Sequence, residues 1–300
     1  MTRPANASEE RPDTLRQRVA SFPLTRMIVA LIAVAVVLAI ANGIVRAIGP
    51  ATWWVRPVVT LLLVHAAYVL YVRLYERRSV AELDRWAAGR GLILGIIAGI
   101  SLLSVLVAAL TGLGAYEASW RGWEGVGRTL LMATAAAYVE EIIFRGILYR
   151  LLEAMTGTWI ALVASAGLFG VMHLSNPDAT VLAAGAIALE AGLLLASLFA
   201  FARRLWAPIG LHLGWNFGVA GVYGLAVSGV RQRGILEGSL SGPEWLTGGA
   251  FGIEASALTV VACSAAATLL LYLAAREGRI VRPMWKRRPR AEKASNTVAS

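Results

Sequence analysis

Apolar residues along this chain fall into eight long stretches separated by shorter polar segments. Each stretch has about 20 mostly apolar residues, which is the length that an α-helix needs to cross a bilayer. The stretches run approximately over residues 27–45, 55–73, 91–112, 129–150, 157–174, 180–201, 205–228 and 253–275. The pattern therefore predicts an all-α, polytopic membrane bundle of about eight transmembrane helices.

The apolar stretches leave no segment long enough for a separate soluble core, so we expect one membrane domain with polar tails. The predicted parts are a polar tail over 1–24, a transmembrane domain over 25–276 and a basic tail over 277–300. Residues 76–88 have the pattern of a short amphipathic helix at the membrane surface. Residues 229–252 are rich in glycine, and we expect a plain connecting loop.

Composition and charge agree with a membrane protein. Only 15% of the residues are charged, well below the roughly 25% of soluble domains. The net charge of +10 could indicate a nucleic-acid partner, but the basic residues lie beside apolar stretches, where they orient a protein in the membrane. With both termini in the cytoplasm, 22 of the 28 Lys and Arg residues lie on the inner side and 6 on the outer side. We therefore predict a multi-pass protein of the cell membrane with cytoplasmic termini and no nucleic-acid partner.

Glycine recurs at four-residue spacing in two of the stretches. These two ladders are Gly91, Gly95 and Gly99 in the third stretch, and Gly210, Gly214 and Gly218 in the seventh. Small residues at this spacing let helices approach closely in lipid. We predict a packing role for both ladders and expect the second to hold the seventh stretch tightly against a neighbour.

Three ionisable residues, Glu140, Glu141 and Arg145, interrupt the fourth stretch near its middle. Each such residue costs on the order of 2.5–3.5 kcal/mol at mid-bilayer, so they must face protein or water. Glu141 and Arg145 are spaced i,i+4 and can form a pair. Glu140 is rotated about 100° away from that pair and has no partner in its own helix, which suits a general base.

Two further stretches contribute polar side chains of a catalytic type. Phe169 and His173 share a helical face in the fifth stretch, and His212 and Asn216 share one in the seventh. The remaining histidine, His65, has no evident partner, and we interpret it as structural. Function is the usual reason for such intramembrane groups, although a polar network that only fixes helix packing is the alternative.

A metal site is a further alternative. Glu140, His173 and His212 have the composition of a catalytic zinc site with an open position. The sequence contains no H-E-x-x-H pattern that would support it. We therefore predict no cofactor and no metal ligand, and leave zinc as the open alternative.

The order of these motifs resembles that of a known family. EEIIFRG over 140–146, FGVMH over 169–173 and HLGWN over 212–216 follow one another on separate apolar stretches. Together they resemble the CPBP family, the CAAX-type and bacteriocin-processing intramembrane proteases that are also called the Abi family. Glu190 with Gly192 also looks like the family. The resemblance covers about residues 127–220, the predicted motif core.

The resemblance implies an eight-helix bundle with a polar intramembrane cavity and glutamate-dependent peptide hydrolysis. Glu140 would be the base that activates water, and His173 would help to hold that water. His212 and Asn216 would stabilise the oxyanion. The supporting residues would be Glu141, Arg145 and Phe169.

We therefore expect an intramembrane endopeptidase that cuts a membrane-associated protein or peptide by glutamate-activated water. The alternative is a non-catalytic scaffold or immunity-type protein that binds another membrane protein. A transporter is a weaker third reading, because the sequence shows no inverted repeat.

One feature conflicts with straight helices between the predicted ends. His212 lies six residues after Trp206, about 9 Å from the inner end of its stretch, whereas His173 lies near the outer end of its own. We expect the fifth stretch to be shifted, tilted or broken so that His173 reaches Glu140, since irregular backbone is tolerated where it lines a cavity.

Overall fold

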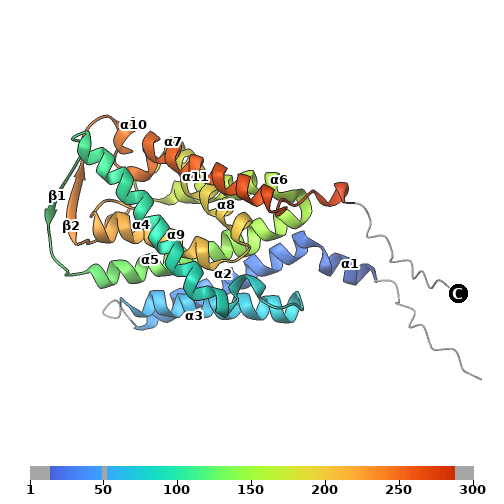
Figure 1. Cartoon of the computed structure of the whole chain (residues 1–300). Helices are drawn as coiled ribbons and strands as arrows, with labels where there is room; N and C mark the ends of the chain where they lie inside the picture. Colours follow the sequence, from blue (N-terminus) through green and yellow to red (C-terminus); the bar gives the residue numbers. More distant parts are fainter. Residues whose placement is uncertain (1–13, 49–52, 288–300) are drawn as a thin grey trace, which may run out of the picture.

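The computed structural model describes residues 14–48 and 53–287 and consists mainly of helices packed side by side (Figure 1). In chain order the helices are α1 (Leu15–Ser21), α2 (Pro23–Ile48), α3 (Val55–Leu70), α4 (Ala88–Gly112), α5 (Val126–Glu141), α6 (Arg150–Met172), α7 (Val181–Ile187), α8 (Leu193–Ala202), α9 (Trp206–Asn216), α10 (Glu244–Thr247) and α11 (Ala257–Arg276). Turns of π-helix extend several of them: η2 (Tyr71–Tyr75), η5 (Ile142–Tyr149), η7 (Ala188–Gly192) and η8 (Phe217–Val222). The 3-10 turns are η3 (Ala81–Leu83), η4 (Arg85–Ala87), η6 (His173–Ser175), η9 (Ile253–Ala255) and η10 (Met284–Lys286).

The architecture confirms a polytopic helical bundle. Within the described residues, six helices are long and apolar enough to cross a membrane. One of them, Val126–Ser175, is 50 residues long and covers two of the predicted spans. Helix α9 with η8 covers the seventh predicted span and is not among the six. The number of eight spans stays a prediction.

A sharp turn at Gly157 folds the 50-residue helix back on itself. Gly157 has φ 78° and ψ 171° inside α6, a conformation that L-residues with side chains rarely adopt. A Cβ at this position would also lie 2.7 Å from the carbonyl oxygen of Val281. Beyond the turn, the ring of Phe169 packs against that of Phe144 with centroids 4.9 Å apart. Residues on either side of Gly157 therefore form two limbs that run side by side.

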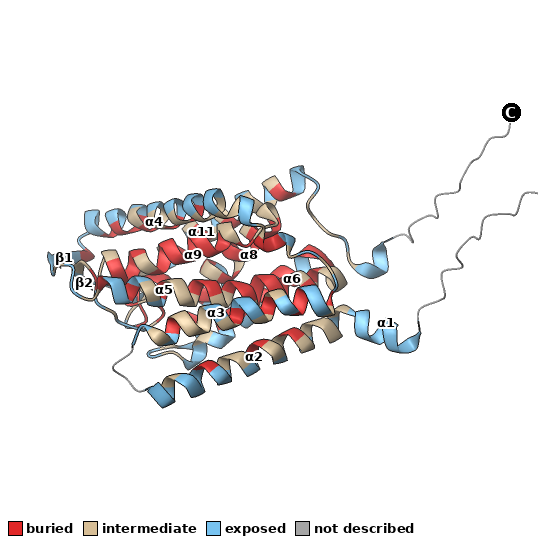
Figure 2. Cartoon of the chain, turned by 90° about the horizontal axis from the view of Figure 1, so that it is seen from below, coloured by how far each residue is buried: buried red, intermediate tan, exposed pale blue. Residues whose placement is uncertain are grey.

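Helix α9 lies at the centre of the bundle. Every residue from Pro208 to Asn216 is buried (Figure 2). The two glycine ladders, predicted to serve packing, pack against each other: a Cβ on Gly95 would lie 2.9 Å from the Cα of Gly210, and one on Gly210 would lie 3.1 Å from the Cα of Gly95. Because no side chains separate the two backbones, α4 fixes the position of α9.

At one end of the bundle, the strand end, β1 (Tyr116–Trp120) pairs antiparallel with β2 (Leu236–Leu240), with Tyr116 opposite Leu240 (Figure 1). The prediction of a plain connector over 229–252 was therefore wrong. This segment contains β2 and α10, because β1 supplies the hydrogen-bond partners that a local pattern cannot reveal.

At the opposite end, the tail end, α1 and η10 emerge from the bundle (Figure 1). The predicted amphipathic helix over 76–88 is wrong, because this segment forms the short turns η3 and η4 before α4 begins. Glu76 is buried, and its carboxylate accepts hydrogen bonds from Arg150 Nη2 at 2.7 Å and Tyr71 Oη at 2.8 Å. Burial alone would raise the pKa of Glu76, but Arg150 and Arg78 outweigh it and hold the pKa below its ordinary value.

The described residues include only part of each predicted tail. Residues 1–13 and 288–300 lie outside the described residues. Helix α1 lies within the predicted N-terminal tail, and α2 begins at Pro23. The first residues of the basic tail pack on the bundle, where the backbone N–H of Val281 donates to Thr158 Oγ1 at 2.9 Å. The domain boundaries remain predictions.

Candidate active site

The turn at Gly157 brings Glu140 and His173 to the same height in the bundle. Glu140 lies 17 residues before Gly157, and His173 lies 16 residues after it. Since each helical residue rises about 1.5 Å, the two limbs carry these side chains to nearly equal distances from the turn. From the sequence, straight helices would have kept His173 away from Glu140. That mismatch arose because the fourth span was predicted to end near residue 150, seven residues before the actual turn at Gly157.

Helix α9 begins inside the bundle rather than at its surface, which raises His212 to the same level. The backbone N–H of Leu205 donates to the carbonyl of Glu82 at 2.8 Å, and Leu205 lies close to Gly146, where an added Cβ would lie 3.4 Å from its Cδ1. His212 lies seven residues after Leu205, and Glu140 lies six residues before Gly146. Both therefore reach a similar height above this contact, through a shift of register rather than a break.

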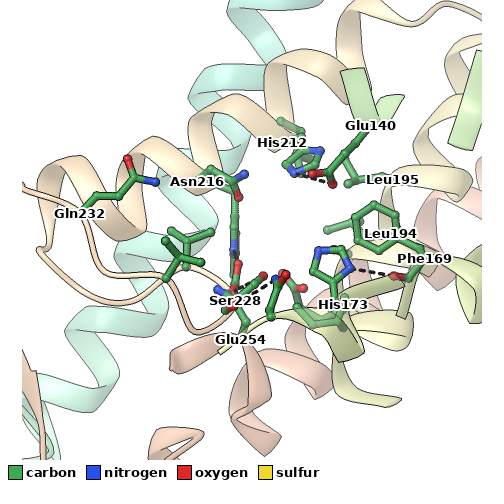
Figure 3. Close-up of a pocket in the computed structure, with 18 residues that line it drawn as sticks. Glu140, Phe169, His173, Leu194, Leu195, His212, Asn216, Ser228, Gln232 and Glu254 are labelled. Atoms are coloured by element: carbon green, nitrogen blue, oxygen red, sulfur yellow. Dashed lines mark hydrogen bonds and ion pairs between the residues drawn. The ribbon is translucent and has the colours of Figure 1, made fainter. Parts of the chain in front are cut away.

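All four predicted catalytic residues, Glu140, His173, His212 and Asn216, line one cavity of about 160 Å³ (Figure 3). They come from α5, η6 and α9. Phe169 lines the same cavity from α6. The side chains that the sequence placed on three separate stretches thus converge.

Glu141 and Arg145 form the predicted ion pair, and the structure adds His212 to it. Glu141 Oε1 accepts hydrogen bonds from Arg145 Nη1 at 2.7 Å and from His212 Nδ1 at 3.0 Å. The side chains of Glu141 and Arg145 are fully buried. Arg145 Nη2 also donates to the carbonyl of Gly192 at 3.1 Å. These contacts fix the His212 ring and direct its Nε2 away from Glu141.

Glu140 has a different environment from its neighbour. Its side chain is 31% exposed, and its Oε2 lies 3.9 Å from His212 Nε2. That oxygen is buried and has no hydrogen-bond partner among the described residues. A buried carboxylate oxygen is costly without a hydrogen-bond donor, and a water molecule in the cavity is the natural donor.

His173 also directs one ring nitrogen toward the cavity. Its Nδ1 donates to the carbonyl of Phe169 at 2.7 Å, because a carbonyl can only accept. In the neutral ring, Nε2 is then the acceptor. The ring of Phe169 lies 4.7 Å from His173 and 6.2 Å from His212, centroid to centroid. The centroids of the two imidazole rings can therefore be no further apart than the sum of these two distances, which keeps both rings at one cavity.

The sequence analysis missed Glu254, which lies in η9 and lines the same cavity. Its Oε1 accepts from the indole Nε1 of Trp215 at 3.1 Å, and its Oε2 accepts from the hydroxyl of Ser228 at 3.0 Å and from its backbone N–H. Asn176 Nδ2 donates to the carbonyl of Ser228 at 3.1 Å. Glu254 thus ties the turn at Ser228 to α9. Its position at the edge of an apolar stretch gave no local signal of burial.

Other polar residues are placed as follows. Glu190, noted with the family resemblance, is buried and lines the cavity. His65 does have a partner, contrary to expectation, since its Nδ1 lies 2.5 Å from the hydroxyl of Tyr138. His65 is not among the residues that line the cavity. The cavity wall also includes Gln232, which the sequence analysis did not single out.

The zinc alternative requires three ligands within reach of one ion. Across residues 14–48 and 53–287, no group of three or more His, Cys, Asp or Glu side chains could hold a metal ion. Glu140, His173 and His212 therefore do not form a preformed three-ligand site, although all three line the cavity.

Comparison with known proteins supports the resemblance. Residues 98–218 match the family model described as "Type II CAAX prenyl endopeptidase Rce1-like". No curated protein and no solved structure matches the chain. The matched residues include most of α4, all of α5 to α9, and every predicted site residue. Over residues 98–218 the chain is therefore similar to the Rce1-like type II CAAX prenyl endopeptidases, in agreement with the resemblance of its motifs.

Proposed function

We propose that this protein is an intramembrane endopeptidase in which Glu140 activates a water molecule for attack on a peptide bond of a membrane-associated protein. The general activity, that of an intramembrane endopeptidase, is supported by the match to the family model. The role of Glu140 as the base rests on its position: it lines the cavity with His173 and His212, its side chain is 31% exposed, and its unpartnered Oε2 lies 3.9 Å from His212 Nε2, whereas Glu190 in the same cavity is fully enclosed.

The proposed reaction begins with Glu140 removing a proton from water while the water oxygen bonds to the scissile carbonyl carbon. His173 Nε2 would accept a hydrogen bond from the second O–H of this water, which stays on the water oxygen, and so hold the water in line. The negative charge that develops on the carbonyl oxygen requires donors aimed at it. The side-chain amide of Asn216 and the Nε2–H of His212 would supply them; because His212 Nδ1 also donates to Glu141, this role requires the doubly protonated imidazolium form of His212.

Collapse of the tetrahedral intermediate breaks the C–N bond. Glu140 would then return its proton to the departing amine, which completes the hydrolysis without a net change at the protein. The same carboxylate thus serves first as base and then as acid, and its partial exposure of 31% leaves it accessible to both water and substrate.

The test is Glu140→Gln, which keeps the shape of the side chain but cannot accept the proton. We expect cleavage to fall by about 10²–10⁴-fold, the usual contribution of a general base. Membranes that contain the active protein or the variant are incubated, and the released peptide ends are compared by mass spectrometry. Glu117→Gln on β1, an exposed position, is the matched control and should cleave normally.

Retained cleavage in a correctly folded Glu140→Gln variant would remove Glu140 as the base. A cellular phenotype that survives this substitution, yet is lost when the glycine ladders are disrupted, would favour the scaffold or immunity-type alternative.

A further inference from the structure

A second, larger cavity of about 700 Å³ lies at the strand end and adjoins the catalytic cavity. Val230 and Gln232 belong to the walls of both. The side chains that distinguish the second cavity, here named the arginine basin, are Arg121, Arg128, Arg231 and Arg233. Four guanidinium groups around one cavity give it a strongly positive potential.

The acidic residues nearby offset only part of this charge. Arg233 Nη1 lies 2.9 Å from Glu124 Oε1, and Arg121 Nη1 lies 3.5 Å from Glu237 Oε1. The Glu124 and Glu237 side chains are 85% and 62% exposed, so both pairs are weak. Among the described residues, Arg128 and Arg231 have no carboxylate within ion-pair distance. The basin therefore has an excess of positive charge.

The position of Arg128 adds to this excess. It lies in the first turn of α5, where the helix dipole is positive and where no acidic residue balances it. A basic residue at this position disfavours the helix, whereas an anion in the basin would be attracted by both the dipole and the guanidinium.

The basin is held together by backbone contacts. The hydroxyl of Thr129 donates to the carbonyl of Arg233 at 2.6 Å, and the N–H of Arg121 donates to the carbonyl of Ile235 at 2.9 Å. Gly125, with φ +83°, lets the Arg233 side chain pack over the start of α5, where a Cβ would lie 3.0 Å from Arg233 Cβ. These contacts fix the backbones of Arg121 and Arg233, and the guanidinium carbon of Arg128 lies 5.6 Å from the centroid of the Trp53 ring.

We propose that the arginine basin binds carboxylates of the substrate peptide and so selects substrates with acidic residues beside the cleaved bond. This inference rests on the proposed function. A peptide is favoured over a lipid headgroup because the basin shares its wall with the catalytic cavity, so one extended chain can occupy both.

The distance between the arginine basin and Glu140 follows from α5, which contributes residues to the walls of both cavities. Met132 in the basin precedes Glu140 by eight residues and Arg128 precedes it by twelve, which corresponds to about 12–18 Å along the helix. An extended peptide rises about 3.3 Å per residue. The acidic residues should therefore lie about three to six residues from the cleaved bond.

The experiment first identifies peptides that membranes with the wild-type protein cleave and those with Glu140→Gln do not. We expect Asp and Glu to be enriched about three to six residues from the cut on one side only. One such peptide is then resynthesised with Asn or Gln at these positions. This change should lower kcat/KM about fivefold per exposed contact for the wild type and have no effect on the Arg128→Gln, Arg231→Gln double variant.

Arg90→Gln, an exposed arginine of α4 distant in sequence from the basin, is the control and should respond to the acidic residues as the wild type does. Reactions in vesicles of phosphatidylcholine, with and without phosphatidylglycerol, separate peptide from lipid. Sensitivity to the double substitution only when phosphatidylglycerol is present would assign the basin to lipid headgroups and overturn the proposal.

The two possible failures differ in their signature. Cleavage that does not depend on Glu140 contradicts the proposed function. Cleavage that depends on Glu140 but shows no acidic preference, or keeps that preference in the double variant, contradicts the arginine basin alone.

Discussion

At the residue scale, two adjacent carboxylates have different environments because one helical step turns them about 100° apart. Glu141 faces Arg145 and His212 and is fully buried, so it is fixed in a pair. Each carboxylate keeps one buried oxygen without a partner among the described residues, but only Glu140 lines the cavity, and its side chain is 31% exposed. The difference explains why the proposed base is Glu140 rather than its neighbour.

Glu254 provides the first prediction. Glu254→Ala leaves the Trp215 indole and the Ser228 backbone N–H without their acceptor, at a cost of about 1–3 kcal/mol for each buried donor. We expect a lower melting temperature and a fall in kcat/KM of about 10–100-fold, since the turn at Ser228 forms part of the cavity wall. Trp215→Phe, which loses only one of these bonds, should have a smaller effect. Unchanged cleavage in Glu254→Ala would show that the turn does not position the site.

At the scale of elements, the packing of α4 against α9 determines where His212 and Asn216 lie. At Gly95 and Gly210 an added Cβ on either helix would overlap the backbone of the other, so the two backbones lie against each other there. Two glycine ladders that meet in this way remove the side-chain layer that usually separates helices, so dispersion contacts between backbones hold α9 in place.

A matched pair of substitutions in α4 tests this packing. Gly95→Ala places a methyl group 2.7 Å from the backbone nitrogen of Leu211, and overpacking of this kind costs about 1–3 kcal/mol. We expect a lower melting temperature in detergent and reduced cleavage. Gly89→Ala makes the same chemical change in the same helix, where nothing lies within 4 Å of the new Cβ. It should be neutral or stabilising by about 0.5–1 kcal/mol; equal effects of the two substitutions would refute close packing as the reason for the ladder.

At the scale of the whole molecule, the two ends of the bundle differ in charge. The tail end carries α1 and η10, and the strand end carries β1, β2 and the arginine basin (Figure 1). The excess of Lys and Arg on the side of the termini favours the tail end as the cytoplasmic one. The acidic substrate segment would then bind on the outer side.

Cysteine labelling tests this orientation, because the one native cysteine, Cys263, is buried. We expect Ser119→Cys on β1 to react with a membrane-impermeant maleimide in intact cells. Ser21→Cys at the end of α1 should react only after the cells are opened. Both positions are exposed, so the reverse pattern would establish the opposite orientation.

The sequence alone determined the membrane class and the local chemistry. The length of each apolar stretch reports the bilayer thickness, and spacing within one helix reports which side chains share a face. Both depend on the nearest residues along the chain, which is why the Glu141–Arg145 pair was predicted correctly.

The tertiary structure decided the heights of the helices relative to one another. The turn at Gly157 and the internal start of α9 at Leu205 bring Glu140, His173 and His212 to one level. An apolar side chain is about equally stable at every depth of the hydrocarbon core, so hydropathy does not fix where along the membrane normal each helix begins. The role of Glu254 was likewise decided by tertiary structure, because its partners Trp215 and Ser228 come from distant parts of the chain and leave no local pattern in the sequence.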